Sequence, residues 1–141
     1  MSNVNELWLS PSITLGKSDH HQLLALTGMG RSDDVVDDLL QELDRANVLA
    51  DTELPPDVVR MGSVVRFRTG RDERRVSLVY PAEADIGSGK ISVLTPVGTA
   101  LIGLRAGQSI TFRTRDGRPQ MLTVLTVSPP DEDDEPGPAA A

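Results

Sequence analysis

The chain has 141 residues, which is enough for one ordinary domain or for one compact domain with a small appendage. It contains no cysteine, so disulfide bonds and thiolate metal sites are excluded, and this usage fits a cytoplasmic protein. No run of about 18 apolar residues occurs, and residues 1–12 lack the pattern of a signal peptide, so we expect no membrane contact. The aromatic residues are too few to offer much ring surface to a flat ligand. They are Trp8, Phe67, Tyr80 and Phe112.

The net charge of −7 is unevenly distributed along the chain. Residues 1–57 hold 11 acidic and 3 basic side chains, a balance of −8. Residues 58–130 hold 5 acidic and 11 basic side chains, a balance of +6, and residues 131–141 hold 5 acidic and no basic ones, a balance of −5. Ordinary solvated surfaces can cluster in this way by chance. We interpret the division as two modules with different electrostatic partners, because the structural signals change at the same place.

Two short helices are predicted in the N-terminal part. Ser18 is expected to cap the first, which ends at Gly28 or Gly30, each a good left-handed terminator. Ser32 is expected to cap the second, whose apolar residues recur at the three- and four-residue spacing of one helix face. These residues are Val35, Val36, Leu39, Leu40, Leu43 and Ala46. We predict an antiparallel helical hairpin, a short coiled coil joined by residues 29–31, because each helix needs the other to bury its apolar stripe.

Beyond Pro56 the apolar residues alternate with polar ones, which is typical of half-buried strands. Five strands are expected, at residues 64–69, 75–80, 90–93, 109–114 and 121–127. Thr95 as cap and Pro96 at the first helical position predict one short helix, which Gly103 closes. Asp116 and Gly117 predict a hairpin turn between the last two strands. The sequence therefore predicts an α+β fold with a mainly antiparallel sheet and one short helix packed on it.

This pattern divides the chain into three segments. Residues 1–57 contain the helical hairpin, and the first ten of them form a loose or edge segment. Residues 58–128 contain the sheet. Residues 129–141 form an acidic tail that cannot bury anything and is expected to be disordered.

Few residues suggest catalysis or cofactor binding. His20 and His21 are adjacent, so on a helix they point about 100° apart and cannot chelate one metal ion together. The glycines and lysine of residues 87–90 precede a strand instead of a helix, so they would offer a phosphate no helix N-terminus. No Ser-His-Asp arrangement is suggested. We therefore expect no catalytic residue, no bound metal and no cofactor.

Two charged groups remain as candidates. The acid pairs Asp33–Asp34 and Asp37–Asp38 at the hairpin tip could hold Mg²⁺, although solvating the helix and favouring its dipole is the commoner role. A set of arginines could form a stripe across two strand hairpins. They are Arg66, Arg68, Arg71, Arg74, Arg75, Arg113, Arg115 and Arg118. Because no aromatic ladder is interleaved with them, an acidic protein surface is a better partner than nucleic acid.

Several linked motifs resemble a known family. Residues 83–86, the run Thr95-Pro96-Val97-Gly98-Thr99-Ala100-Leu101-Ile102-Gly103-Leu104 and residues 114–117 resemble the C-terminal FKBP-like domain of the transcript-cleavage factors GreA and GreB. This resemblance covers about half the chain. Further motifs look like signatures of the Rnk branch of that family, the regulators of nucleoside diphosphate kinase. They lie at residues 42–46, 54–59, 78–81, 95–98 and 104–107.

The resemblance implies a short coiled coil, an FKBP-like domain, and binding of bacterial RNA polymerase near its secondary channel. Nucleic acid would then be contacted only through polymerase, and we expect a monomer. The family's docking surface falls on Pro96, and we extend it to Leu94, Thr95 and Val97 as an exposed apolar patch. Leu94 stands two residues before the proline, where GreB has an acid, so the docking contact differs in detail.

The hairpin tip departs from the Gre pattern. It lacks the characteristic acidic loop, and a helix over residues 33–47 would span only about 22 Å, roughly half the length of a Gre coiled coil. Asp33, Asp34 and Asp37 would then stop well short of the polymerase metal. We therefore expect a non-enzymatic transcription regulator that competes with Gre-type factors without stimulating transcript cleavage.

Two alternative functions stay open, and a third is disfavoured. A genuine cleavage factor would use Asp33, Asp34 or Asp37 to recruit Mg²⁺. An adaptor for some other acidic protein would never meet polymerase. A prolyl isomerase would need an apolar cup lined with several aromatic rings, and the scarcity of aromatic residues argues against it.

Overall fold

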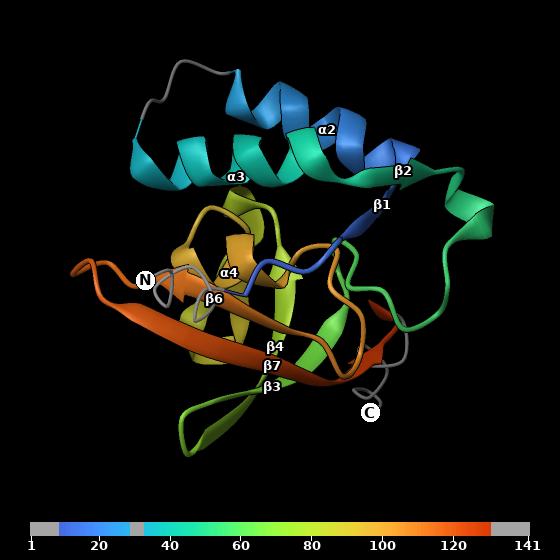
Figure 1. The fold of residues 1–141 in the computed structure, drawn as a ribbon. Helices are drawn as coiled ribbons and strands as arrows, with labels where there is room; N and C mark the ends of the chain where they lie inside the picture. Colours follow the sequence, from blue (N-terminus) through green and yellow to red (C-terminus); the bar gives the residue numbers. More distant parts are fainter. Residues whose placement is uncertain (1–8, 29–32, 131–141) are drawn as a thin grey trace, which may run out of the picture.

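The computed structural model describes residues 9–28 and 33–130. They form an α+β fold, as predicted, in which a helical hairpin lies over a curled sheet (Figure 1). In chain order the elements are β1 (Thr14–Gly16), α2 (Lys17–Thr27), α3 (Asp34–Arg45), β2 (Asn47–Leu49), β3 (Val64–Thr69), β4 (Asp72–Val79), β5 (Lys90–Ser92), α4 (Pro96–Leu101), β6 (Ser109–Arg113) and β7 (Pro119–Ser128).

The main sheet has the strand order β5-β4-β3-β7-β6. All its pairs are antiparallel except β4 with β5, which run parallel, so the prediction of a mainly antiparallel sheet is confirmed. The predicted turn between β6 and β7 is also present, with Gly117 at a φ of 86° that favours glycine. Leu9 adds to the free edge of β6, where its N–H donates to Thr111 Oγ1 at 2.9 Å and its carbonyl accepts from the Thr111 N–H at 2.9 Å.

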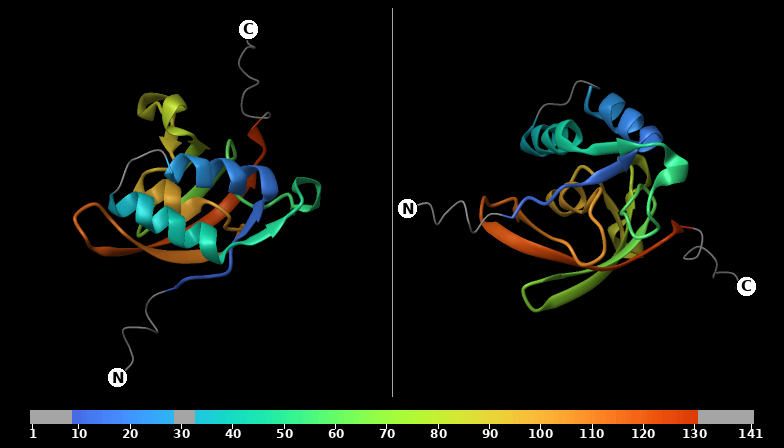
Figure 2. Two further views of the ribbon diagram at one scale, coloured as in Figure 1. Left: turned by 90° about the horizontal axis from the view of Figure 1, so that it is seen from above. Right: turned by 45° about the vertical axis from the view of Figure 1, so that its right-hand side comes forward.

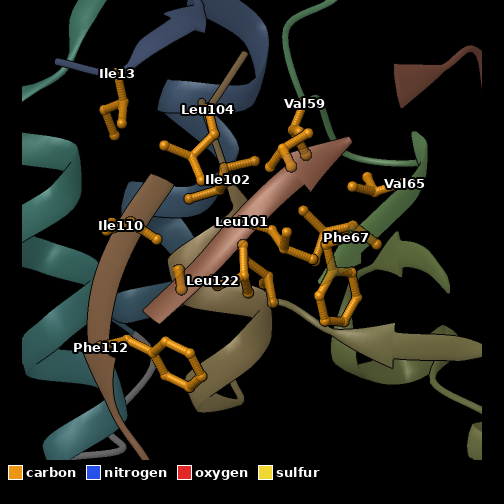
Figure 3. Close-up of a cluster of buried hydrophobic side chains, with 14 of the residues drawn as sticks. Ile13, Val59, Val65, Phe67, Leu101, Ile102, Leu104, Ile110, Phe112 and Leu122 are labelled. Atoms are coloured by element: carbon orange, nitrogen blue, oxygen red, sulfur yellow. The ribbon is translucent and has the colours of Figure 1, made fainter. Parts of the chain in front are cut away.

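The three helices all lie on one side of the sheet (Figure 2). Helix α4 sits in the concave face, and the hairpin of α2 and α3 covers it from outside, with α3 against α4. Leu39 and Leu43 of α3 are buried in the same cluster as Leu101 of α4 and Leu122 of β7, part of which Figure 3 shows. One apolar core therefore includes residues from both sides of the predicted boundary between residues 57 and 58. The division of the chain into three segments stays a prediction.

The helix ends differ from those predicted. Helix α2 follows β1 directly, so its N-cap is Gly16 and not Ser18. Helix α3 is capped by Asp33, whose Oδ1 accepts the N–H of Val36 at 2.9 Å, so the expected cap Ser32 was wrong by one residue. Gly28 has a φ of −90° and is not a left-handed terminator. The linker of residues 29–31 lies outside the described residues.

Strands β1 and β2 fix the base of the hairpin, and the sequence did not predict them. They flank the hairpin, pair in parallel with Thr14 opposite Asn47, and so hold the start of α2 next to the end of α3. The N–H of Thr14 also donates to the carbonyl of Gly103, just beyond α4, at 3.0 Å. The start of the hairpin is thus tied to the sheet domain by a backbone hydrogen bond, and its end is tied to its start.

A half-buried carboxylate adds a second attachment. Asp19, in the first turn of α2, accepts the N–H of Met61 through Oδ2 at 3.0 Å. Burial raises the pKa of the Asp19 carboxyl above its usual 3.8, while the Met61 hydrogen bond and Arg60 act in the opposite direction. Nearby, Tyr80 donates its hydroxyl to Gln22 Oε1 at 2.9 Å, and burial raises the Tyr80 pKa to about 12. Loss of hydration is therefore the largest cause of the pKa shift of both Asp19 and Tyr80.

Asp19 should make the stability of the fold depend on pH. Because the pKa is raised, the folded state still holds a proton at pH values where the unfolded chain has already lost it. The stabilisation from this group is therefore fully present at pH values below 3.8, and it is lost as the pH rises through the raised pKa. We expect Asp19→Asn to gain stability relative to the wild type over that rise, since its amide oxygen can still accept from Met61. Urea unfolding of both proteins across a pH series measures this difference. A difference that stays constant with pH would contradict the prediction.

Candidate functional site

The loop from β5 into α4 is held by a chain of short hydrogen bonds. Thr95 caps α4, as predicted, by accepting the N–H of Gly98 through Oγ1 at 3.0 Å, and it donates to the carbonyl of Ser92 at 2.8 Å. Thr99 Oγ1 donates to the carbonyl of Val93 at 2.7 Å. Pro96 occupies the first turn, where its missing N–H costs nothing. The backbone around Pro96 is therefore rigid before anything binds.

The loop is less exposed than the sequence suggested. Leu94, Thr95, Pro96 and Val97 are all half-buried, and Leu94 and Val97 pack against the core. The expectation of an exposed patch at these residues was wrong, because fully buried Val93 pulls the neighbouring chain inward. Leu94→Asp would place a charge against the core. This substitution would disturb folding as well as binding, so it cannot test binding alone.

An apolar cavity of about 410 Å³ opens beside Pro96, between the concave face of the sheet and the start of α4. Its larger apolar lining residues are Phe67, Ile86, Ile91, Pro96, Val97 and Phe112. Ile86 stands at its edge in a single 3₁₀ turn (Ile86–Ser88) and is 81% exposed. Ile86 was not among the site residues that the sequence predicted. Its signal was a lone large apolar side chain in the otherwise polar run of residues 83–90.

The predicted arginine stripe is divided between opposite faces of the sheet. Arg74 and Arg115 line the apolar cavity and supply positive charge to its rim. Arg66 and Arg68 alternate with buried Val65 and Phe67 along β3, so they point to the outer face. One continuous stripe is therefore excluded, since neighbouring residues of a strand face opposite ways.

A second, acid–arginine cavity of about 530 Å³ adjoins the first, and Pro96 lines both. Asp34, Asp37 and Asp38 of α3 line it together with Arg113 and Arg115 of the β6–β7 hairpin, and so does Asp33, whose carboxylate caps the helix. Partial burial raises the pKa of Asp38, and the carboxylates of Asp34 and Asp37 add to the effect. The structure thus brings together the hairpin acids and the Pro96 loop, which the sequence assigned to separate modules.

The described residues contain no group of three or more His, Asp or Glu side chains that could hold a metal ion. His20 Nε2 instead lies 3.0 Å from the carbonyl oxygen of Leu43, within hydrogen-bond distance. Among residues 9–28 and 33–130, no helix has the length and apolar character needed to cross a membrane.

The arrangement of a curled sheet, a capped α4 and an N-terminal hairpin is shared with known proteins. Residues 54–129 match the family model described as "Transcription elongation factor, GreA/GreB, C-term". The chain belongs to the GreA/GreB family. The resemblance of its motifs is thereby confirmed, while the likeness to FKBP domains stays a prediction.

Individual GreA/GreB relatives agree with this assignment. The chain is 46% identical over 95 residues to the regulator of nucleoside diphosphate kinase of Escherichia coli strain K12, which covers 66% of this chain and 70% of that protein. It is 36% identical over 80 residues to transcription elongation factor GreA of Thermodesulfovibrio yellowstonii, covering 55% of this chain and about half, 51%, of that factor. The solved GreA/GreB elongation factor from Nitrosomonas europaea superposes with a TM-score of 0.68 at 38% identity, over 84% of this chain and 99% of that one.

Helix α4 of this GreA/GreB-type fold should not tolerate a side chain at Gly98. A Cβ there would overlap the carbonyl oxygen of Ser92 and approach the Cα of Val93 to 2.8 Å. We expect Gly98→Ala to lower the free energy of unfolding by about 3 kcal/mol, because backbone atoms cannot give way as a flexible side chain can. Denaturant unfolding measures the loss. Gly87→Ala is the control, since its Cβ would meet only Asp85 Oδ1 at 3.6 Å, and a loss of similar size there would contradict the explanation.

Proposed function

We propose that this chain is a transcription regulator that binds bacterial RNA polymerase through the apolar cavity and the Pro96 loop. The observation that carries the proposal is the combination of an open apolar cavity, an almost fully exposed Ile86 at its edge and two arginines on its rim. An exposed apolar side chain that is continuous with an apolar cavity forms a larger apolar patch, and such patches often mark protein-binding surfaces. Membership of a family named for transcription elongation supports bacterial RNA polymerase as that partner.

The cavity suits a helical surface that carries an apolar anchor and nearby acids. An inserted side chain would contact Phe67, Ile91 and Phe112, while Ile86 would close over it from the edge. Arg74 and Arg115 would then meet acidic side chains at the rim, where charges mainly set the association rate and its dependence on salt. The buried anchor should carry most of the affinity.

We further propose that the protein occupies this docking site without stimulating transcript cleavage, and so competes with Gre-type factors. Helix α3 has only 12 residues, or about 18 Å, and it lies across α4 instead of extending away from the sheet. The carboxylate of Asp33 is engaged as a helix cap, and those of Asp34 and Asp37 line the same cavity as Arg113 and Arg115. This placement supports a structural role for the hairpin acids over recruitment of a catalytic Mg²⁺.

Ile86→Asp should weaken binding to RNA polymerase by about 2 kcal/mol, roughly thirtyfold in Kd, on the scale of an interface hot spot. The fold should survive because the Ile86 side chain is 81% exposed. Met121→Asp is the matched control, since Met121 is 52% exposed on β7 and does not line the cavity. Titration of labelled protein with polymerase core enzyme measures both affinities. Equal weakening by the two variants, or none by Ile86→Asp, would show that the docking surface lies elsewhere.

In a backtracked elongation complex, the wild-type protein should leave the transcript at full length and should slow cleavage by an added GreA factor. Gel analysis of the labelled transcript measures both effects. Asp33→Asn is the informative variant, because asparagine caps a helix about as well as aspartate while removing the charge. Transcript shortening by the wild type that Asp33→Asn abolishes would establish cleavage stimulation and overturn the non-catalytic assignment. Absence of competition with GreA would instead count against the shared docking site.

A further inference from the structure

The segment that precedes β1 pairs with the outermost strand of the main sheet. Strand β6 is last in the strand order, and Leu9 is the first residue that the structure describes. The Leu9 N–H donates to Thr111 Oγ1, and the Leu9 carbonyl accepts from the Thr111 N–H, both at 2.9 Å. Hydrogen bonds from both backbone groups of one residue to a single partner residue are typical of an antiparallel pair. The segment therefore runs antiparallel to β6, with Leu9 opposite Thr111.

A cavity of about 300 Å³, which we call the edge cavity, lies beside this pair and is lined by α3, α4 and β6. Pro96 and Ala100 of α4 and Phe112 of β6 give it an apolar wall, and Gln41 is among the polar side chains that α3 adds. Its volume is about ten times the ~30 Å³ of one water molecule in the liquid, which leaves room for a bicyclic ring. A mixed lining suits tryptophan, because its ring is apolar and its N–H donates a hydrogen bond.

Two features direct the side chain of residue 8 toward the edge cavity. Side chains two residues apart in an extended chain lie on the same face, and Ser10 lines the edge cavity. With Leu9 opposite Thr111, residue 8 falls opposite Phe112, and directly opposed side chains lie on the same face of a sheet. Phe112 lines the edge cavity as well. The side chain at this position is that of Trp8, the single tryptophan of the chain.

We propose that residues 6–8 continue along β6 as an added edge strand and that the indole ring of Trp8 occupies the edge cavity, between α3 and Phe112. The added strand closes the free edge of β6, which would otherwise invite pairing with another chain. The ring joins α3 to the sheet next to Pro96, which lines the edge cavity as well as the two cavities described above. This inference does not rest on polymerase binding.

The fluorescence of Trp8 tests the proposal in the full-length chain, because no other tryptophan contributes. We expect acrylamide to quench Trp8 at least about threefold less effectively in the folded protein than in urea, because the cavity walls shield the ring. The protection should be the same at about 1 μM and about 50 μM protein, since a contact within one molecule does not depend on concentration. Equal quenching in the folded and unfolded states would overturn the proposal. Protection that grows with concentration would also overturn it, because the ring would then lie in a second copy of the chain.

Two substitutions at Leu9 test the added strand. Leu9→Pro removes the N–H that donates to Thr111, and it should raise the quenching of Trp8 at least twofold. Leu9→Ala keeps this N–H and should change the quenching much less. The fold should survive both changes, because the Leu9 side chain is 39% exposed. Protection that is equal in the two variants would show that strand pairing does not hold the ring.

A nitroxide label locates the ring, since the chain has no cysteine of its own. The label on Gln41→Cys, in the edge cavity, should quench Trp8 at least twofold more than the label on Arg71→Cys, in the turn between β3 and β4. Nitroxides quench only at short range, so this comparison separates the edge cavity from other shielded places. Equal quenching by the two labels would place the ring outside the edge cavity and would overturn the proposal.

Discussion

The close packing of α4 against the strand backbone beside it is the constraint on which the rest of the structure depends. Gly98 has no room for a Cβ next to Ser92 and Val93, so the helix must lie flat in the concave face of the sheet. This position leaves its outer side to be covered, and α3 supplies Leu39 and Leu43 for that purpose. It also fixes Pro96, at the first turn of α4, where the sheet, the hairpin and solvent meet. Both cavities adjoin Pro96 for this reason.

Burial of the α3 stripe decides where the hairpin acids lie. Because Val36, Leu39 and Leu43 face the core, the acidic side chains between them are directed to the edge of the helix beside the β6–β7 hairpin. There they face Arg113 and Arg115 across the acid–arginine cavity. The same apolar residues that stabilise the fold thus hold the acids beside the sheet instead of at the end of a projecting hairpin.

Local signals in the sequence predicted much of the fold. Thr95 and Pro96 mark the start of α4 because the preferences for a cap and for a first-turn residue act within four residues. The alternation of apolar and polar residues marks the strands because a half-buried sheet imposes a period of two. Strands β1 and β2 have three residues each, too few to show any period. The burial of Leu94 and the pairing of Pro96 with the hairpin acids depend on tertiary packing, to which no local pattern corresponds. Ile86 was overlooked because a lone large apolar residue in a polar run does not by itself show that the side chain is exposed at the edge of a cavity.

The alternation that built the sheet also separates its two chemical surfaces. Phe67 faces the apolar cavity, whereas its neighbours Arg66 and Arg68 face outward. Across the strand pair, Arg74 lines the cavity and Arg75 stands opposite Arg66. A slip of one residue in the register of β3 would exchange these faces, placing arginines in the core and Phe67 in solvent. Because that exchange is so costly, an apolar cavity and an arginine-bearing outer surface can lie only one strand thickness apart in the same sheet.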